Sequence, residues 1–164
     1  MSAHPAPLQH TTDWLQVVYG GLIIAVCDMI FAVTLWFTWN TAGLVKVFQT
    51  IAVGVLGKDS YQGGITSALL GATLHLFMAT MFVTAYTLVG QRAPALLRKP
   101  FVYGPLYGVL LYAIMNFVVM PLSRVGASPT FKHLNWIVLS IFAHMVFGVI
   151  CVVFARRARA QSVR

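Results

Sequence analysis

WLQVVYGGLIIAVCDMIFAVTLWFTW, residues 14–39, carries a single charged side chain, Asp28, in an otherwise uncharged and mostly apolar run. A helix needs about 20 such residues to cross the hydrocarbon core of a bilayer, which is roughly 30 Å thick. Three further stretches reach this length, at residues 65–90, 101–122 and 134–155. The sequence therefore predicts an all-α integral membrane protein, a bundle of four membrane-spanning helices.

The composition of the whole chain excludes most other classes of protein. Of its 164 residues, 59% are hydrophobic and 9% are charged, whereas a soluble domain is about one quarter charged. The net charge of +8 does not indicate nucleic-acid binding, because the Lys and Arg residues lie in loops and in the C-terminal tail. We expect the lipid bilayer to be the main partner, and the sequence leaves open whether a second copy of the chain or another membrane subunit also binds.

The segments outside the four spans complete the predicted organisation. Residues 1–13 contain Pro5 and Pro7 and are predicted to form a disordered tail, and residues 156–164 are predicted to form a basic one. Between the first two spans, residues 41–57 place apolar side chains at helical spacing. This segment is predicted to be a short helix that lies at the membrane interface.

Positive charge is unevenly distributed between the two ends of the predicted bundle. Four spans place both termini on one side, and cytoplasmic segments carry the excess of Lys and Arg. The terminal side has Arg92, Arg98, Lys99, Arg156, Arg157, Arg159 and Arg164, and the other side has Lys46, Lys58, Arg124 and Lys132. We therefore expect both termini in the cytoplasm. Amphipathic aromatic rings then lie at the outer interface, namely Trp36, Trp39, Tyr61 and Trp136.

Four polar side chains interrupt the predicted spans. At about 1.5 Å of rise per residue, Asp28, His75 and His144 each lie roughly 15 to 16 Å from the outer end of their span. Asn116 lies nearer to the outer side, at roughly 9 Å. Because an ionisable side chain at this depth is costly, we expect all four to face inward as a buried polar layer. Asp28 is expected to share a proton or an ion pair with one histidine.

Small residues recur at steps of three and four on the same helix faces as these polar groups. Such residues mark the faces on which membrane helices approach one another closely. The predicted packing glycines are Gly21, Gly71, Gly104, Gly108 and Gly148. The large aliphatic and aromatic side chains on the other helix faces are then expected to contact lipid.

Several functions fit a polar layer of Asp28, His75, Asn116 and His144. The layer could join the helices by hydrogen bonds, or it could handle protons or small ions, because ionisable groups inside membranes mark functional sites. Asp28, His75 and His144 are also ligands that a divalent metal accepts. Alternatively, His75 and His144 could hold a b-type haem between two helices. An assembly or partner subunit of a membrane complex is a further alternative.

No pattern typical of an enzyme accompanies this layer. The chain shows no nucleophile with a base and an orienting carboxylate, no phosphate-binding glycine loop and no paired carboxylates. The sequence therefore favours a protein without catalytic activity. It predicts no cofactor unless the histidines hold haem b or a divalent metal.

Three segments of the chain carry a family resemblance. They are VFQTIAVGVLGKDSYQGGITSALLGATLHLFMATMFVTAYT (47–87), YGPLYGVLLYAIMNFVVMPLS (103–123) and AHMVFGVICVVFARR (143–157). Together they resemble the YagU-like family of small bacterial inner-membrane proteins. The resemblance implies a four-span protein of the bacterial inner membrane, and it brings no activity with it. The matching positions are Gly54, Gly57, His75, Tyr107, Gly108, Asn116, Pro121 and His144.

Overall fold

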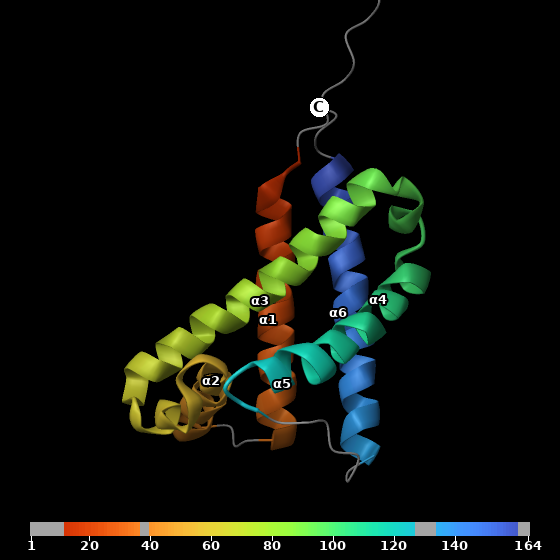
Figure 1. Cartoon of the computed structure of the whole chain (residues 1–164). Coiled ribbons are helices and arrows are strands. Elements are labelled where there is room, and N and C mark those ends of the chain that lie inside the picture. The colour runs from red at the N-terminus through yellow and green to blue at the C-terminus, as the bar shows by residue number, and fades with distance from the viewer. Residues whose placement is uncertain (1–11, 37–39, 127–133, 161–164) are drawn as a thin grey trace, which may run out of the picture.

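The computed structural model describes residues 12–36, 40–126 and 134–160, and this part of the chain is helical with no strand. Four long apolar helices dominate it (Figure 1). The elements are α1 (Trp14–Trp36), α2 (Thr41–Leu56), η1 (Gly57–Gln62), α3 (Gly64–Arg92), η2 (Pro94–Leu97), α4 (Pro100–Ile114), η3 (Met115–Val119), α5 (Met120–Leu122) and α6 (Leu134–Ala160). The predicted all-α bundle with four helices long enough to cross a membrane is therefore confirmed.

The helix bounds differ from the predicted spans mainly at the ends. Residues 37–39 of the first predicted span lie outside the described residues, whereas α6 continues five residues beyond position 155, to Ala160. Basic side chains form the last turn of α6. Arginine is a good helix former and suits the negative end of the helix dipole. The predicted basic tail therefore begins as part of the last helix.

The start of α1 and the end of α6 lie side by side, at the top of the view in Figure 1. The backbone N–H of Asp13 donates to the carbonyl of Ala158 at 3.0 Å. The Asp13 carboxylate accepts a hydrogen bond from the N–H of Leu15 at 3.0 Å, as an N-cap does. The last residues of the predicted disordered tail are thus held against the bundle, and residues 1–11 lie outside the described part.

Close backbone contacts hold the long helices together at glycines. At Gly108 an added Cβ atom would lie 2.0 Å from the carbonyl oxygen of His144, and at Gly148 it would lie 2.0 Å from that of Gly104. A side chain at either position would force α4 and α6 apart. An added Cβ at Gly21 would lie 2.3 Å from the hydroxyl of Thr80, so α1 and α3 also meet at a glycine.

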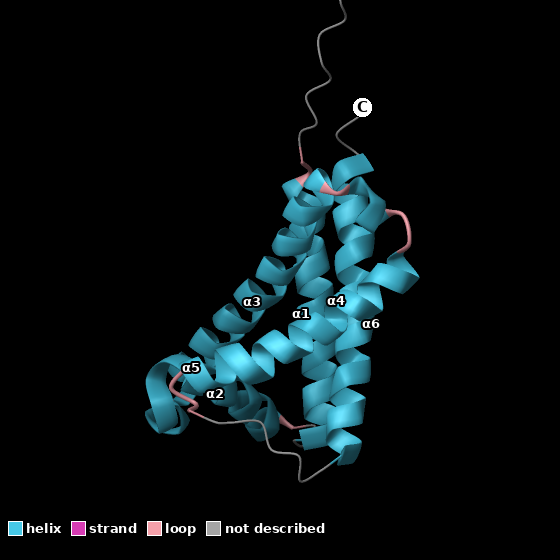
Figure 2. Ribbon diagram, turned by 45° about the vertical axis from the view of Figure 1, so that its right-hand side comes forward, coloured by secondary structure: helices cyan, strands magenta, loops and turns pink. Residues whose placement is uncertain are grey.

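α2 and η1 lie at the end of the bundle opposite the termini (Figures 1 and 2). The segment predicted as a helix over 41–57 is helical from Thr41 to Leu56, and Gly57 ends it with a positive φ of 70°. Gly71 of α3 contacts α2, since an added Cβ would lie 1.8 Å from the Phe48 carbonyl oxygen. The end of the third span also reaches α2, because the N–H of Arg124 donates to the Gly54 carbonyl at 3.0 Å.

The third long helix changes its geometry before it ends. α4 continues through the π-helical turn η3 into the short helix α5. Pro121 has no backbone N–H to donate to the preceding turn, and the N–H of Met120 reaches back five residues to the carbonyl of Met115. This wider turn contains Asn116. Turns of this kind occur frequently at functional sites.

Candidate functional site

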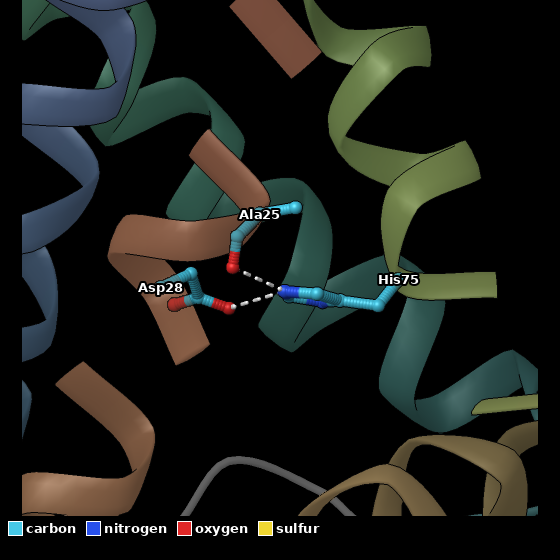
Figure 3. A network of polar contacts seen from close by, with 3 residues as sticks. All are labelled: Ala25, Asp28 and His75. Carbon is cyan, nitrogen blue, oxygen red and sulfur yellow. Dashed lines mark hydrogen bonds and ion pairs between the residues drawn. The ribbon is translucent and has the colours of Figure 1, made fainter. Parts of the chain in front are cut away.

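Asp28 of α1 and His75 of α3, two of the predicted site residues, form a polar contact between two long helices (Figure 3). The Nε2 atom of His75 lies 3.7 Å from Oδ2 of Asp28. The same atom lies 3.1 Å from the backbone carbonyl oxygen of Ala25. The His75 side chain is 15% exposed and the Asp28 side chain is 34% exposed. We call these two residues the Asp28–His75 pair.

The contacts of His75 decide which ring nitrogen carries the hydrogen. A backbone carbonyl can only accept a hydrogen bond, so Nε2 must donate to Ala25. In the neutral ring Nδ1 is then the unprotonated nitrogen, with a lone pair available. A proton that binds to Nδ1 makes the ring a cation beside the Asp28 carboxylate, at ion-pair distance.

His144 and Asn116 are bonded to their own helices rather than to the pair. His144 donates from Nδ1 to the Ser140 carbonyl at 2.7 Å, one turn earlier in α6. Asn116 donates from Nδ2 to the Tyr112 carbonyl at 2.9 Å, one turn earlier in the third span. His144 remains close enough to Asp28 for an electrostatic interaction between them. The four residues predicted as one layer therefore separate into a contacting pair and two side chains bonded locally.

Aromatic rings surround His144. Its ring meets the edge of Tyr112 with 5.4 Å between ring centroids, and it lies 5.6 Å from the ring of Phe147. Tyr112 also supplies the carbonyl that accepts from Asn116. His144 thus belongs to the packing of α4 against α6, Asn116 bonds only its own helix, and the Asp28–His75 pair belongs to the contact of α1 with α3.

The described residues do not assemble the predicted metal site. In residues 12–36, 40–126 and 134–160, no three His, Cys, Asp or Glu side chains lie together as ligands for a metal ion. The haem interpretation needs open space beside small residues such as Gly71 and Gly148. Helix backbone fills that space, from Phe48 in the first case and from Gly104 in the second. The arrangement of the described residues therefore favours neither a bound metal ion nor a haem.

A second polar cluster joins α2 to α3, and the sequence interpretation did not include it. Ser67 donates to the Ser60 carbonyl at 2.6 Å, Gln49 donates to the Gly64 carbonyl at 3.1 Å, and Ser60 donates to the Gln49 carbonyl. These three side chains are almost fully buried. The sequence signal for this cluster was the presence of two serines, Ser60 and Ser67, on either side of the Gly63–Gly64 turn. We call Gln49, Ser60 and Ser67 the α2–α3 cluster.

The packing glycines occupy the contacts between helices. All five of Gly21, Gly71, Gly104, Gly108 and Gly148 are buried. Their neighbours differ: Gly21 meets α3, Gly71 meets α2, and the remaining three lie where α4 crosses α6. The glycines therefore determine which helices are in contact. The polar residues on the same helix faces are brought to the same contacts.

Comparison of the chain with models of protein families, with curated proteins and with solved structures gives no match.

Proposed function

We propose that this chain is a multi-pass membrane protein that binds and releases a proton at the Asp28–His75 pair within the membrane. The observation that carries the proposal is the position of His75 Nε2, 3.7 Å from Asp28 Oδ2 and 3.1 Å from the Ala25 carbonyl. An acid and a base in contact inside apolar helices can hold a proton as an ion pair, in which each charge is stabilised by the other. The proposed role needs no catalytic group.

The two acceptors around Nε2 explain how the pair holds a proton. When His75 is neutral, its Nε2 hydrogen is satisfied by the Ala25 carbonyl. Protonation at Nδ1 leaves that hydrogen bond in place and adds a positive charge next to Asp28. The carboxylate stabilises the cation electrostatically, because the low dielectric of the membrane strengthens their attraction. Loss of the proton restores the neutral ring without a change of rotamer.

The bacterial inner membrane and the cytoplasmic termini belong to the same proposal. Among the described residues, six Lys and Arg lie in or next to elements at the end of the bundle where α1 begins and α6 ends, and three lie at the other end. The first group is Arg92, Arg98, Lys99, Arg156, Arg157 and Arg159, and the second is Lys46, Lys58 and Arg124. The positive-inside rule supports cytoplasmic termini, and the resemblance to YagU-like proteins supports the bacterial inner membrane. Reporter fusions at residue 164 and within 127–133 test the orientation.

Proton movement through the reconstituted protein tests the proposed function. Liposomes with a trapped pH-sensitive dye receive the wild-type chain, Asp28→Asn or His75→Phe, and an imposed pH gradient is followed over time. The wild type is expected to dissipate the gradient faster than protein-free liposomes. Both variants are expected to fall to the protein-free rate, because each removes one partner of the pair.

Matched variants separate the pair from general effects of charge and ring size. Asp59→Asn removes a carboxylate in η1, outside the long helices, and His144→Phe makes the same ring change in α6. Both are expected to keep most of the wild-type rate. Circular dichroism of every variant checks the fold. Wild-type rates in Asp28→Asn and His75→Phe would reject the proton role and leave the pair as a helix-packing contact.

A further inference from the structure

His75 also lines a groove between α1, α2 and α3. The groove has a volume of about 240 Å³. Apart from His75, every described residue that lines it is apolar, including Met29, Leu44, Phe48, Ala72 and Leu76. We call it the His75 groove. Apolar walls with one polar group are typical of sites for small, mostly hydrophobic ligands.

The groove opens toward the surface that faces lipid. Leu22, Val26 and Ile30 line it on the α1 side, and these three side chains are exposed. An occupant therefore enters from the bilayer. Sites for drug-sized ligands measure roughly 300 to 1,000 Å³, so the His75 groove suits a ring or short head with part of a chain, while the remainder of the molecule stays in lipid.

The polar group in the groove is a hydrogen-bond acceptor. Every buried side-chain nitrogen or oxygen among the described residues has a hydrogen-bond partner. Among the described residues, Nε2 makes the hydrogen bond and the ion-pair contact of the His75 ring, and Nδ1 makes neither. Nδ1 is therefore not fully buried, and the His75 side chain lines the groove. In the neutral ring it presents a lone pair, because Nε2 holds the hydrogen.

We propose that the His75 groove binds a bilayer-dissolved amphiphile that has an apolar chain and a hydroxyl group, and that this hydroxyl donates a hydrogen bond to Nδ1 of His75. An acyl chain alone would leave the lone pair without a donor, and a charged head would meet apolar walls. The inference rests on the proposed function, because the bound hydroxyl lies where a proton reaches the Asp28–His75 pair.

Two ligands that differ in one hydrogen-bond donor test the inference. The protein in phosphatidylcholine nanodiscs is labelled by light with a diazirine derivative of an alkylphenol, and mass spectrometry locates the labelled residues. Unlabelled 4-nonylphenol and its methyl ether, 4-nonylanisole, then compete. Labels are expected on groove residues of α1, α2 and α3. The phenol should compete about threefold to tenfold better, the range that one net hydrogen bond supplies.

Two variants connect this preference to the groove. His75→Phe keeps a ring but removes the acceptor, so the phenol and the ether should compete equally. Ala72→Trp fills the groove and should abolish labelling by the probe, whereas Leu69→Trp adds the same side chain at an exposed position of α3 and should leave labelling unchanged. Equal competition in the wild type, or labels outside the groove, would overturn the inference.

The same assay separates this inference from the proton role and identifies the source of the hydroxyl. Asp28→Asn should stop proton movement yet keep the phenol preference, because the Ala25 carbonyl still holds the Nε2 hydrogen. A preference without proton movement in the wild type would reject the proton role alone. Competition by a short-chain prenyl quinol but not by a diacylglycerol indicates a quinol-type ligand, and the reverse result indicates a lipid alcohol.

Discussion

The α2–α3 cluster and the Asp28–His75 pair both place polar atoms against α3, yet they are built differently. In the cluster, Gln49, Ser60 and Ser67 are 7%, 0% and 3% exposed, and each side chain donates to a backbone carbonyl of the partner element or of the turn. In the pair, the carboxylate lies 3.7 Å from Nε2 and both side chains are partly exposed. The α2–α3 cluster is therefore sealed from the surroundings by burial, whereas the Asp28–His75 pair is partly exposed.

This difference separates a structural role from an exchangeable one. A buried polar group that has all its partners resists change, because breaking any bond leaves an unsatisfied atom. In the pair, Nδ1 of His75 is not fully buried and Asp28 lies beyond hydrogen-bond distance. In the proposed function, this arrangement gains and loses a proton without disturbing the helices. Measurements of stability in three variants test this difference between the cluster and the pair.

The largest effect is expected where α2 and α3 share backbone contact. In Gly71→Ala the new Cβ would lie 1.8 Å from the Phe48 carbonyl oxygen, and a backbone atom cannot move aside as a side chain can. The free energy of unfolding should fall by about 3 kcal/mol. Titration with sodium dodecyl sulfate, followed by circular dichroism, measures it.

Gly54→Ala is the matched control in α2, since its Cβ would lie 3.7 Å from that of Ser123, an ordinary contact. Its stability should equal or exceed that of the wild type, because alanine favours helix. Equal stability of the two variants would show that the close contact between α2 and α3 is not a source of stability.

Removal of one cluster hydroxyl should have an intermediate effect. Ser67→Ala removes one of the two donors to the Ser60 carbonyl, which keeps the N–H of Gly63 at 3.3 Å, and it removes a neighbour of Gln49. The cost should be about 1 to 1.5 kcal/mol, the upper part of the range for one net hydrogen bond, because the site is buried. Thr73→Ala, whose hydroxyl bonds only its own exposed helix turn, should change stability by less than about 0.5 kcal/mol. A similar loss in both would contradict the sealed character of the cluster.

The smallest effect on stability is expected at the pair. Asp28→Asn keeps the size of the side chain, and interhelical polar contacts in membranes average about 0.6 kcal/mol. The free energy of unfolding should therefore change by less than about 1 kcal/mol, in the same detergent titration. A loss as large as that of Ser67→Ala would make Asp28 a structural residue and remove the contrast between the two sites.

The four long helices were predictable because length and hydropathy alone decide whether a segment can cross a bilayer. The helix α2 was predictable from its apolar spacing as well. The local hydrogen bonds of His144 and Asn116 could not be predicted, because the depth of a residue along a helix does not specify the direction in which its side chain points. Each of these side chains found an acceptor one turn away, at Ser140 and Tyr112.

Composition and hydrophobic period are enough to predict a bundle of apolar helices with a few ionisable side chains inside, since burial of apolar surface depends on these two properties. The contact of Asp28 with His75 instead of His144 follows from the folded arrangement of the helices. That choice depends on which helices touch and on their rotation, which are set by glycine contacts such as Gly21 with Thr80 and Gly108 with His144. Close packing is a property of two surfaces together, and neither helix specifies it alone.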